Sequence, residues 1–140
     1  MKNLNVILYK VNRNLNRCYR TAAFFGVKNI FTYDCNYELK GNLFNSSNQV
    51  SISSISEMPK GQNVAYMETN GKINIEDVDW RYIDTICFGG ETNDFTGKEF
   101  NNINKIKIKS FGKQKGLTVE AALAITLYKI REYEKIQNNI

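Results

Sequence analysis

Short apolar runs alternate with segments of helical periodicity along this chain, and that alternation restricts its fold more than any other feature. Runs of strand length occupy residues 5–9, 27–33, 50–55, 63–67 and 83–88. Helical spacing marks residues 14–25, which Gly26 would end, and residues 117–137. Strands that alternate with helices favour an α/β fold with a mostly parallel sheet flanked by helices.

Two further segments are less regular. Residues 105–109 alternate lysine with isoleucine, which predicts a strand with one basic face. Residues 94–101 suit a short helix, and residues 36–56 are polar, with room for one helical turn before the strand around 50–55. The segment 121–127 of the last helix is apolar nearly all round, so both of its sides need cover. We expect the sheet on one side and a second subunit on the other.

The composition is that of one folded domain, because 42% of the 140 residues are hydrophobic and 24% are charged. No run approaches the ~18 apolar residues of a membrane span, and the N-terminus enters a strand-like run without a signal peptide. The three cysteines lack metal-ligand spacing and histidine is absent, which excludes the usual zinc sites and histidine-activated nucleophiles. We therefore predict a single domain over residues 1–140 in a reduced, cytoplasmic protein, with neither metal nor membrane span.

Positive charge is concentrated in two segments. Residues 1–33 contain six lysines and arginines and no acid, and residues 100–119 contain five lysines and no acid. The intervening residues 34–99 contain eleven acids against five bases. If the fold brings the two basic segments together, the surface would attract a polyanion such as RNA. A merely solvated basic surface is the alternative interpretation.

Glycine-containing turns follow three of the expected strands, at Gly71, at Gly89-Gly90, and at Gly112 with Gly116. Ligands of parallel sheets bind beyond the carboxyl ends of strands, where such turns lie. None of the turns has the G-x-G-x-x-G or G-x-x-x-x-G-K-[ST] spacing of a nucleotide site. Singly, each glycine can also be explained as an ordinary turn.

Three arginines fall on the polar side of the first expected helix. Arg13, Arg17 and Arg20 form either a solvated face or a phosphate clamp, because guanidinium groups pair well with phosphate oxygens. Asn14, at the start of the helix, suits an N-cap. The residues alone leave both interpretations open.

Three segments, taken in order, carry a family resemblance. Residues 14–26 contain Asn14 and then Arg20-Thr21, residues 88–92 contain Gly89-Gly90-Glu91, and residues 108–119 read Ile-Lys-Ser-Phe-Gly-Lys-Gln-Lys-Gly-Leu-Thr-Val. These segments resemble the three motifs of SpoU-type RNA ribose 2′-O-methyltransferases of the SPOUT superfamily. The motifs occur in the same order and with similar separation, and they span nearly the whole chain.

The resemblance implies a SPOUT-like domain with a deep C-terminal trefoil knot, a homodimer, S-adenosylmethionine as cofactor and RNA, most simply tRNA, as substrate. It implies cofactor-binding loops at residues 67–71, 89–91 and 108–117. Within them, the cofactor-binding candidates are Met67, Gly89, Ile108, Gly116 and Leu117.

The resemblance also implies roles for charged residues. Arg20 would organise the RNA phosphate and the ribose hydroxyl, and Asn14 and Glu91 would orient it and the neighbouring loops by hydrogen bonds. A free guanidinium is a poor base, since its pKa exceeds about 12, so the expected role is positioning. The candidate RNA-binding residues are Arg13, Arg17, Lys109, Lys113 and Lys115.

The chain departs from the family pattern at several positions. Asn16 and Asp94 replace glycines, and Lys109-Ser110 replaces Pro-Met. Gly116 and Thr118 replace the serine and asparagine of the third motif. A catalytically degenerate protein that binds RNA or cofactor is therefore the alternative to an enzyme, and an unknotted flavodoxin-like domain is a third possibility.

Overall fold

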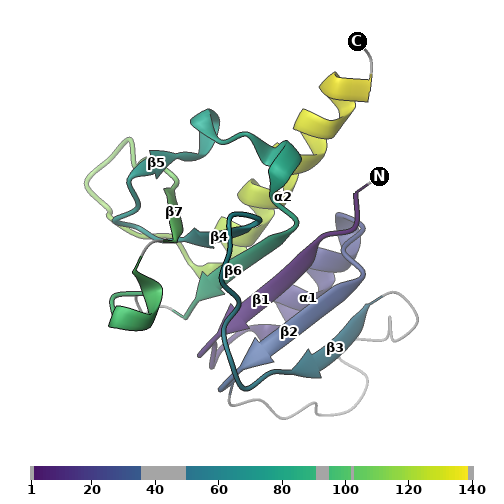
Figure 1. The fold of residues 1–140 in the computed structure, drawn as a ribbon, viewed down its shortest axis with the longest axis vertical. Helices are drawn as coiled ribbons and strands as arrows, with labels where there is room; N and C mark the ends of the chain where they lie inside the picture. Colours follow the sequence, from purple (N-terminus) through teal and green to yellow (C-terminus); the bar gives the residue numbers. More distant parts are fainter. Residues whose placement is uncertain (1, 36–49, 91–94, 102, 139–140) are drawn as a thin grey trace.

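Parallel strands form the centre of the protein in the computed structural model, which describes residues 2–35, 50–90, 95–101 and 103–138. These residues form a seven-stranded sheet in the order β3-β2-β1-β6-β4-β7-β5, and every neighbouring pair is parallel (Figure 1). The strands are β1 (Asn5–Tyr9), β2 (Asn29–Tyr33), β3 (Ser51–Ser54), β4 (Val64–Met67), β5 (Ile73–Asn74), β6 (Thr85–Gly89) and β7 (Asn104–Lys107). The predicted α/β fold with a mostly parallel sheet is confirmed.

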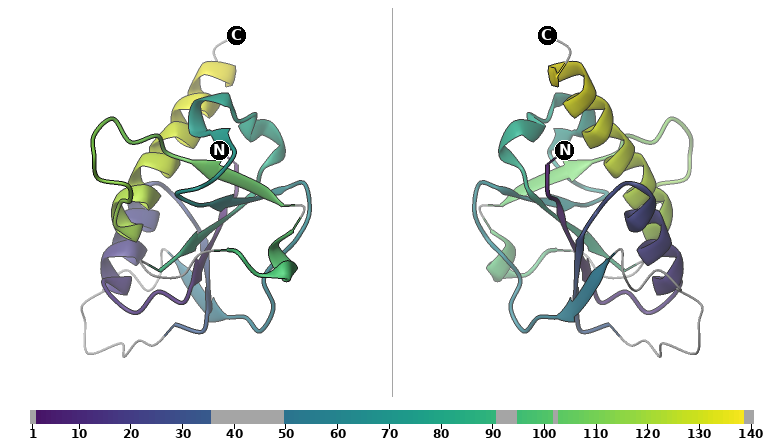
Figure 2. Two further views of the ribbon diagram at one scale, coloured as in Figure 1. Left: turned by 90° about the vertical axis from the view of Figure 1, so that its left-hand side faces the viewer. Right: turned by 90° about the vertical axis from the view of Figure 1, so that its right-hand side faces the viewer.

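Both described α-helices, α1 (Leu15–Phe24) and α2 (Val119–Asn138), lie against one face of the sheet (Figure 2). Alternate strand residues such as Val6, Leu8 and Ile86 point to this face and join the larger hydrophobic core with buried residues of both helices. The period of two along each strand explains the alternation. The helices bury the residues of β1, β4 and β6 that point to this face.

An aromatic cluster packs on the opposite face. Tyr9, Tyr66, Phe95 and Phe100 are buried there together with Cys87. The rings of Tyr66 and Phe95 are 4.7 Å apart between centroids at an interplanar angle of 79°, an edge-to-face arrangement that aromatic pairs favour. The Tyr66 hydroxyl donates a hydrogen bond of 2.5 Å to the Pro59 carbonyl oxygen, so the buried phenol has a polar partner.

The two helices begin and end by different means. Gly26 follows α1 with a φ of 76°, and its N–H donates to the Ala23 carbonyl, as expected for a glycine that ends a helix. Asn14 is the N-cap residue of α1, as predicted, but it has a left-handed φ of 59° and makes no side-chain capping bond. Side-chain capping requires an extended backbone at that position. The Thr118 hydroxyl instead accepts from the Ala121 N–H at 3.3 Å, at the start of α2.

Several sequence predictions need correction in detail. The helix expected over residues 94–101 is a single 3₁₀ turn, Lys98–Phe100, within the part described; it follows Gly97, and glycine disfavours helix. The strand expected over 105–109 ends at Lys107. Strand β5 and the 3₁₀ turns Ile75–Asp77 and Trp80–Tyr82 were not predicted. The helical turn expected before residue 50 lies outside the described residues.

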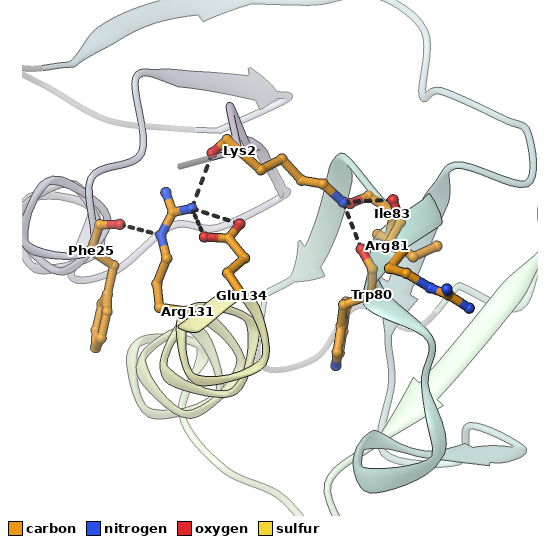
Figure 3. Close-up of polar contacts among 7 residues, drawn as sticks. All are labelled: Lys2, Phe25, Trp80, Arg81, Ile83, Arg131 and Glu134. Atoms are coloured by element: carbon orange, nitrogen blue, oxygen red, sulfur yellow. Dashed lines mark hydrogen bonds and ion pairs between the residues drawn. The ribbon is translucent and has the colours of Figure 1, made fainter. Parts of the chain in front are cut away.

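A polar cluster joins segments at the amino ends of the strands (Figure 3). The largely buried Arg131 of α2 donates from Nε to the Phe25 carbonyl at 2.8 Å and from a terminal nitrogen to the Lys2 carbonyl at 3.0 Å, and it pairs with Glu134 at 2.9 Å. The Lys2 ammonium donates to the carbonyls of Trp80, Arg81 and Ile83 at 2.6, 3.0 and 2.7 Å. Burial lowers the pKa of Lys2. The cluster connects α1, α2, the start of β1 and the segment before β6.

Candidate functional site

A cavity of about 540 Å³ opens at the carboxyl ends of β4, β6 and β7. The strand register sets Met67 beside both Phe88 and Ile106, and these three side chains form part of its wall. The loops that follow the three strands, together with the first turns of α2, supply the rest. The size and position are those of a small-molecule site in a parallel α/β protein.

All five predicted cofactor-binding residues line this one cavity: Met67, Gly89, Ile108, Gly116 and Leu117. They come from the end of β4, the end of β6 and the loop after β7, which are distant in sequence. That these residues bind a cofactor remains a prediction, whereas their convergence is a property of the structure.

Backbone contacts hold the loop after β4 directly against β7. The Glu68 N–H donates to the Ile106 carbonyl at 2.8 Å, and the Lys72 N–H donates to the Lys105 carbonyl at 3.1 Å. At Gly71 a Cβ atom would lie 2.7 Å from the Ile106 carbonyl carbon, which leaves no room for any side chain. Gly71 is therefore required for the close approach of the two backbones that form this side of the cavity.

Glu68 is the carboxylate that the described residues contribute to the cavity lining, and none of the three sequence motifs includes it. Its side chain is 5% exposed, and one of its oxygens lies 3.8 Å from the Lys105 ammonium. A nearly buried carboxylate needs cationic or hydrogen-bonding partners. The sequence did offer one indication of its role: Glu68 comes immediately after a buried strand, in the loop at 67–71 that was already expected to bind the cofactor.

The segment 108–118 forms the outer wall and is largely exposed. The Ser110 hydroxyl accepts from the Gly112 N–H at 3.2 Å and donates to the Gln114 carbonyl at 2.6 Å, which holds the loop in a compact turn. At Gly116 the nearest atom to an added Cβ is the Thr69 hydroxyl oxygen, at 3.9 Å. Gly116 therefore leaves open space where the third motif of the family has a serine.

Two of the three predicted catalytic residues lie outside the cavity lining. Arg20 is an exposed residue of α1 and does not line the cavity, and Asn14 is also exposed. Arg17 lies 4.0 Å from the carboxylate of Glu120, next to the cavity residue Val119, in an exposed ion pair of the kind that contributes little to stability. Glu91 lies outside the described residues, so its predicted role stays a prediction.

The predicted RNA-binding residues lie in two groups. Lys109, Lys113 and Lys115 are exposed and line the cavity mouth, whereas Arg13 and Arg17 are exposed at the start of α1. Among the described residues, neither Lys113 nor Lys115 has a carboxylate within ion-pair distance. Free ammonium groups at the mouth of a cavity suit a phosphate-bearing ligand, and this role also remains a prediction.

The cysteines have the character of core residues. Burial raises the pKa of the Cys18 thiol to about 12 and raises that of Cys87 further, so neither forms a thiolate near neutral pH. The described residues contain no group of three or more potential metal-ligating side chains. No helix among them is long and apolar enough to cross a bilayer. Among the residues that the structure describes, the charged side chains that line the cavity are Glu68 and the loop lysines Lys109, Lys113 and Lys115.

Comparisons with known proteins bear on this arrangement. No protein-family model matches the sequence, and no curated protein matches it. Among solved structures, the enzyme studied for 2-OH methylation of C/U34 on tRNA superposes with a TM-score of 0.83 at 17% identity, covering 96% of this chain and 97% of its own. The A. aeolicus TrmH/SpoU tRNA modifying enzyme gives 0.79 at 20% identity, over 99% of this chain and 78% of its own.

A third structure carries a ligand. The SpoU methyltransferase AviRb from Streptomyces viridochromogenes, in complex with the cofactor AdoMet, gives a TM-score of 0.75 at 14% identity, over 96% of this chain and 62% of its own. This chain has their fold. The resemblance to SpoU-type RNA methyltransferases is thus confirmed at the level of architecture, and the roles of individual residues stay predictions.

Proposed function

We propose that this protein is an S-adenosylmethionine-dependent RNA ribose 2′-O-methyltransferase that acts on tRNA in the cytoplasm, with residues 1–140 as its single domain. One observation carries the proposal: the three loops that resemble or adjoin the family motifs enclose a single cavity at the carboxyl ends of β4, β6 and β7. The shared fold with RNA methyltransferases, one of them in complex with AdoMet, supports it.

The cavity has the chemistry that S-adenosylmethionine requires. Met67, Ile108 and Leu117 provide apolar surface, and the loops at Gly89-Gly90 and Gly116 give close access to backbone groups. Glu68 provides a nearly buried negative charge suited to a cationic ligand. When bound, the cofactor supplies an activated methyl group on a sulfonium centre.

For the reaction, residues of this chain must position an RNA 2′-hydroxyl and allow that hydroxyl to lose its proton. We assign the positioning to Arg20, through a phosphate and the ribose hydroxyl, because a guanidinium forms paired hydrogen bonds with phosphate oxygens. Asn14 and Glu91 would orient Arg20 and the neighbouring loops. Holding the hydroxyl in line with a reactive methyl group accounts for much of the expected acceleration.

A homodimer is part of the proposal, and the outer surface of the helices supports it. Phe24 of α1 and Ile125 and Tyr128 of α2 are exposed large apolar residues. Ile125 and Tyr128 are three positions apart and therefore share one side of α2. Pairing of this surface with a second copy would cover it, and would provide a route by which Arg20 completes a site that one chain leaves without it.

A trefoil knot is part of the same proposal. The loop after β4 is hydrogen-bonded to β7, and the chain continues from β7 through the 108–118 loop into α2, which packs on the other side of the cavity. Threading of this last segment through the earlier loop would explain why Gly71 permits so close an approach. An experimental density map that traces residues 103–119 past residues 67–72 tests the knot.

Two observations favour a second candidate function. Because Arg20 lies outside the cavity and Gly116 lacks a hydroxyl, a protein that binds RNA or cofactor without transferring a methyl group fits the same structure. Both candidates bind S-adenosylmethionine or RNA, and they differ at the transfer step.

Calorimetry with S-adenosylmethionine, followed by transfer of a labelled methyl group to tRNA, separates these possibilities. Leu117→Lys places a cation at the cavity and should weaken cofactor binding at least tenfold. Ile136→Lys is the matched control, since Leu117 and Ile136 are 51% and 55% exposed but Ile136 lies far from the cavity, near the end of α2. Arg20→Ala should abolish transfer while leaving cofactor affinity and oligomeric state unchanged.

Each result has a distinct meaning. Absence of cofactor binding by the wild-type protein would contradict the methyltransferase proposal outright. Binding without any detectable 2′-O-methylnucleoside in the digested tRNA would favour the second candidate. Undiminished transfer by Arg20→Ala would remove Arg20 from the mechanism.

A further inference from the structure

Phe111 is the most exposed large hydrophobic residue among those described, at 93%. It lies in the 108–118 loop at the cavity and belongs to neither hydrophobic core. A single exposed apolar side chain is common on protein surfaces and by itself needs no explanation. The surroundings of Phe111 are what distinguish it.

Hydrogen bonds within the loop hold the backbone on either side of Phe111. The Ser110 hydroxyl accepts from the Gly112 N–H at 3.2 Å and donates to the Gln114 carbonyl at 2.6 Å. These two bonds join the residue before Phe111 to residues after it. The Lys109 ammonium lies 5.9 Å from the centroid of the Phe111 ring, within the range of a cation–π contact. The ring is thus presented to solvent from a turn that is itself held together.

Charge decides what such a ring would contact. Lys109, Lys113 and Lys115 occupy the same loop, and residues 100–119 contain no acid. Lysine is depleted in protein–protein interfaces, so this setting disfavours a second protein as the partner. An aromatic ring among free ammonium groups is the combination that binds unpaired nucleotides, with the ring stacked on a base and the cations on phosphates.

We infer that Phe111 stacks on an unpaired RNA base next to the nucleotide held at the cavity, while Lys109, Lys113 and Lys115 contact the adjoining phosphates. The inference rests on the proposed function and deepens it, since it names single-stranded RNA, such as a tRNA loop, as the form recognised. Bases in a duplex are already stacked on one another and offer no free face to the ring.

The test compares three variants on a short single-stranded RNA that contains 2-aminopurine and on the corresponding duplex. Phe111→Ala should bind the single strand about tenfold more weakly, because removal of one base–ring stack has an effect of this order. Phe111→Trp should restore binding. Tyr82→Ala is the matched control: Tyr82 is also an exposed aromatic, at 68%, with the Arg81 guanidinium 5.3 Å from its ring centroid, but it does not line the cavity.

Two readouts distinguish stacking from a general loss of affinity. The slope of the logarithm of RNA affinity against the logarithm of salt concentration should be the same for wild type and Phe111→Ala, because no charge is removed. In Phe111→Trp, binding of the single strand should quench the fluorescence of the new indole. The only other tryptophan, Trp80, is buried and so should contribute little to this change.

Four results would overturn the inference: no measurable binding of the single strand by wild type, equal affinity of wild type and Phe111→Ala, an equal loss on the duplex, or dissociation of an oligomer in Phe111→Ala. None of these measurements needs the cofactor. If the single-strand results are as expected but methyl transfer is absent, the stacking role stands and the proposed enzymatic activity fails.

Discussion

The two ends of the sheet are built on opposite principles. At the amino ends of the strands, Arg131 bonds two carbonyl oxygens and Lys2 bonds three, and these bonds connect four segments of the chain (Figure 3). At the carboxyl ends, the 108–118 loop is largely exposed, and its charged side chains Lys113 and Lys115 lack ion pairs with described residues. The cations at one end are used in folding, whereas those at the other remain available to a ligand.

This division assigns stability and binding to separate sets of residues. A buried cation without partners costs several kcal/mol, and at the amino ends Arg131 and Lys2 each have more than one oxygen partner. A cation that is to bind phosphate must instead stay hydrated and accessible until its ligand arrives. Substitutions at the two ends should therefore have different measurable consequences.

The largest effect on stability is expected from Arg131→Met. The substitution keeps the apolar stem but leaves the Phe25 and Lys2 carbonyls and the Glu134 carboxylate without their donor. Loss of one partner from a largely buried ion pair should lower the free energy of unfolding by about 3 kcal/mol, measured by urea denaturation. Lys135→Ala, an exposed change on the same helix, should have almost no effect. Equal stability of the two variants would mean that the polar cluster is not what joins the helices to β1.

A smaller loss is expected at the other end of the sheet, from Gly71→Ala. Its Cβ would lie within 2.9 Å of backbone atoms of Ile106 and Lys105, which cannot move without displacing β7. Overpacking of this kind should cost about 2 kcal/mol of unfolding free energy and weaken cofactor binding as well. Gly116→Ala should change stability little, because 3.9 Å separates its added Cβ from the nearest atom. A neutral Gly71→Ala would show that the two backbones can separate.

The sequence pattern was sufficient to predict the strands that are buried on both faces of the sheet. The apolar runs at β1, β4 and β6 are visible because helices cover one face and the aromatic cluster covers the other. Strand β5 has two residues, Ile73–Asn74, and exists only because β7 lies beside it. No local pattern can reveal a strand that depends on a partner so far along the chain.

The location of the cavity was predicted better than the properties of the side chains around it. Resemblance to three motifs located the loops that converge, since such motifs record where the backbone approaches a ligand. It did not indicate that the Glu68 carboxylate is nearly buried in the cavity wall, or that Phe111 is almost fully exposed beside it. Those properties depend on packing between segments, as does the position of Arg20 outside the cavity of a single chain.

The smallest effect on stability, and the sharpest contrast with Arg131, is expected from removing two loop cations together, Lys113→Ala with Lys115→Ala. Both side chains are exposed, so the free energy of unfolding should change by less than about 0.5 kcal/mol. RNA affinity should fall, and the slope of its logarithm against the logarithm of salt concentration should decrease by roughly 0.7 for each phosphate that the variant no longer neutralises. Arg131→Met, measured where it is still folded, should leave that slope unchanged. If the double variant kept the wild-type slope, the loop lysines would be surface charges without a ligand, and the contrast between the two ends would concern stability alone.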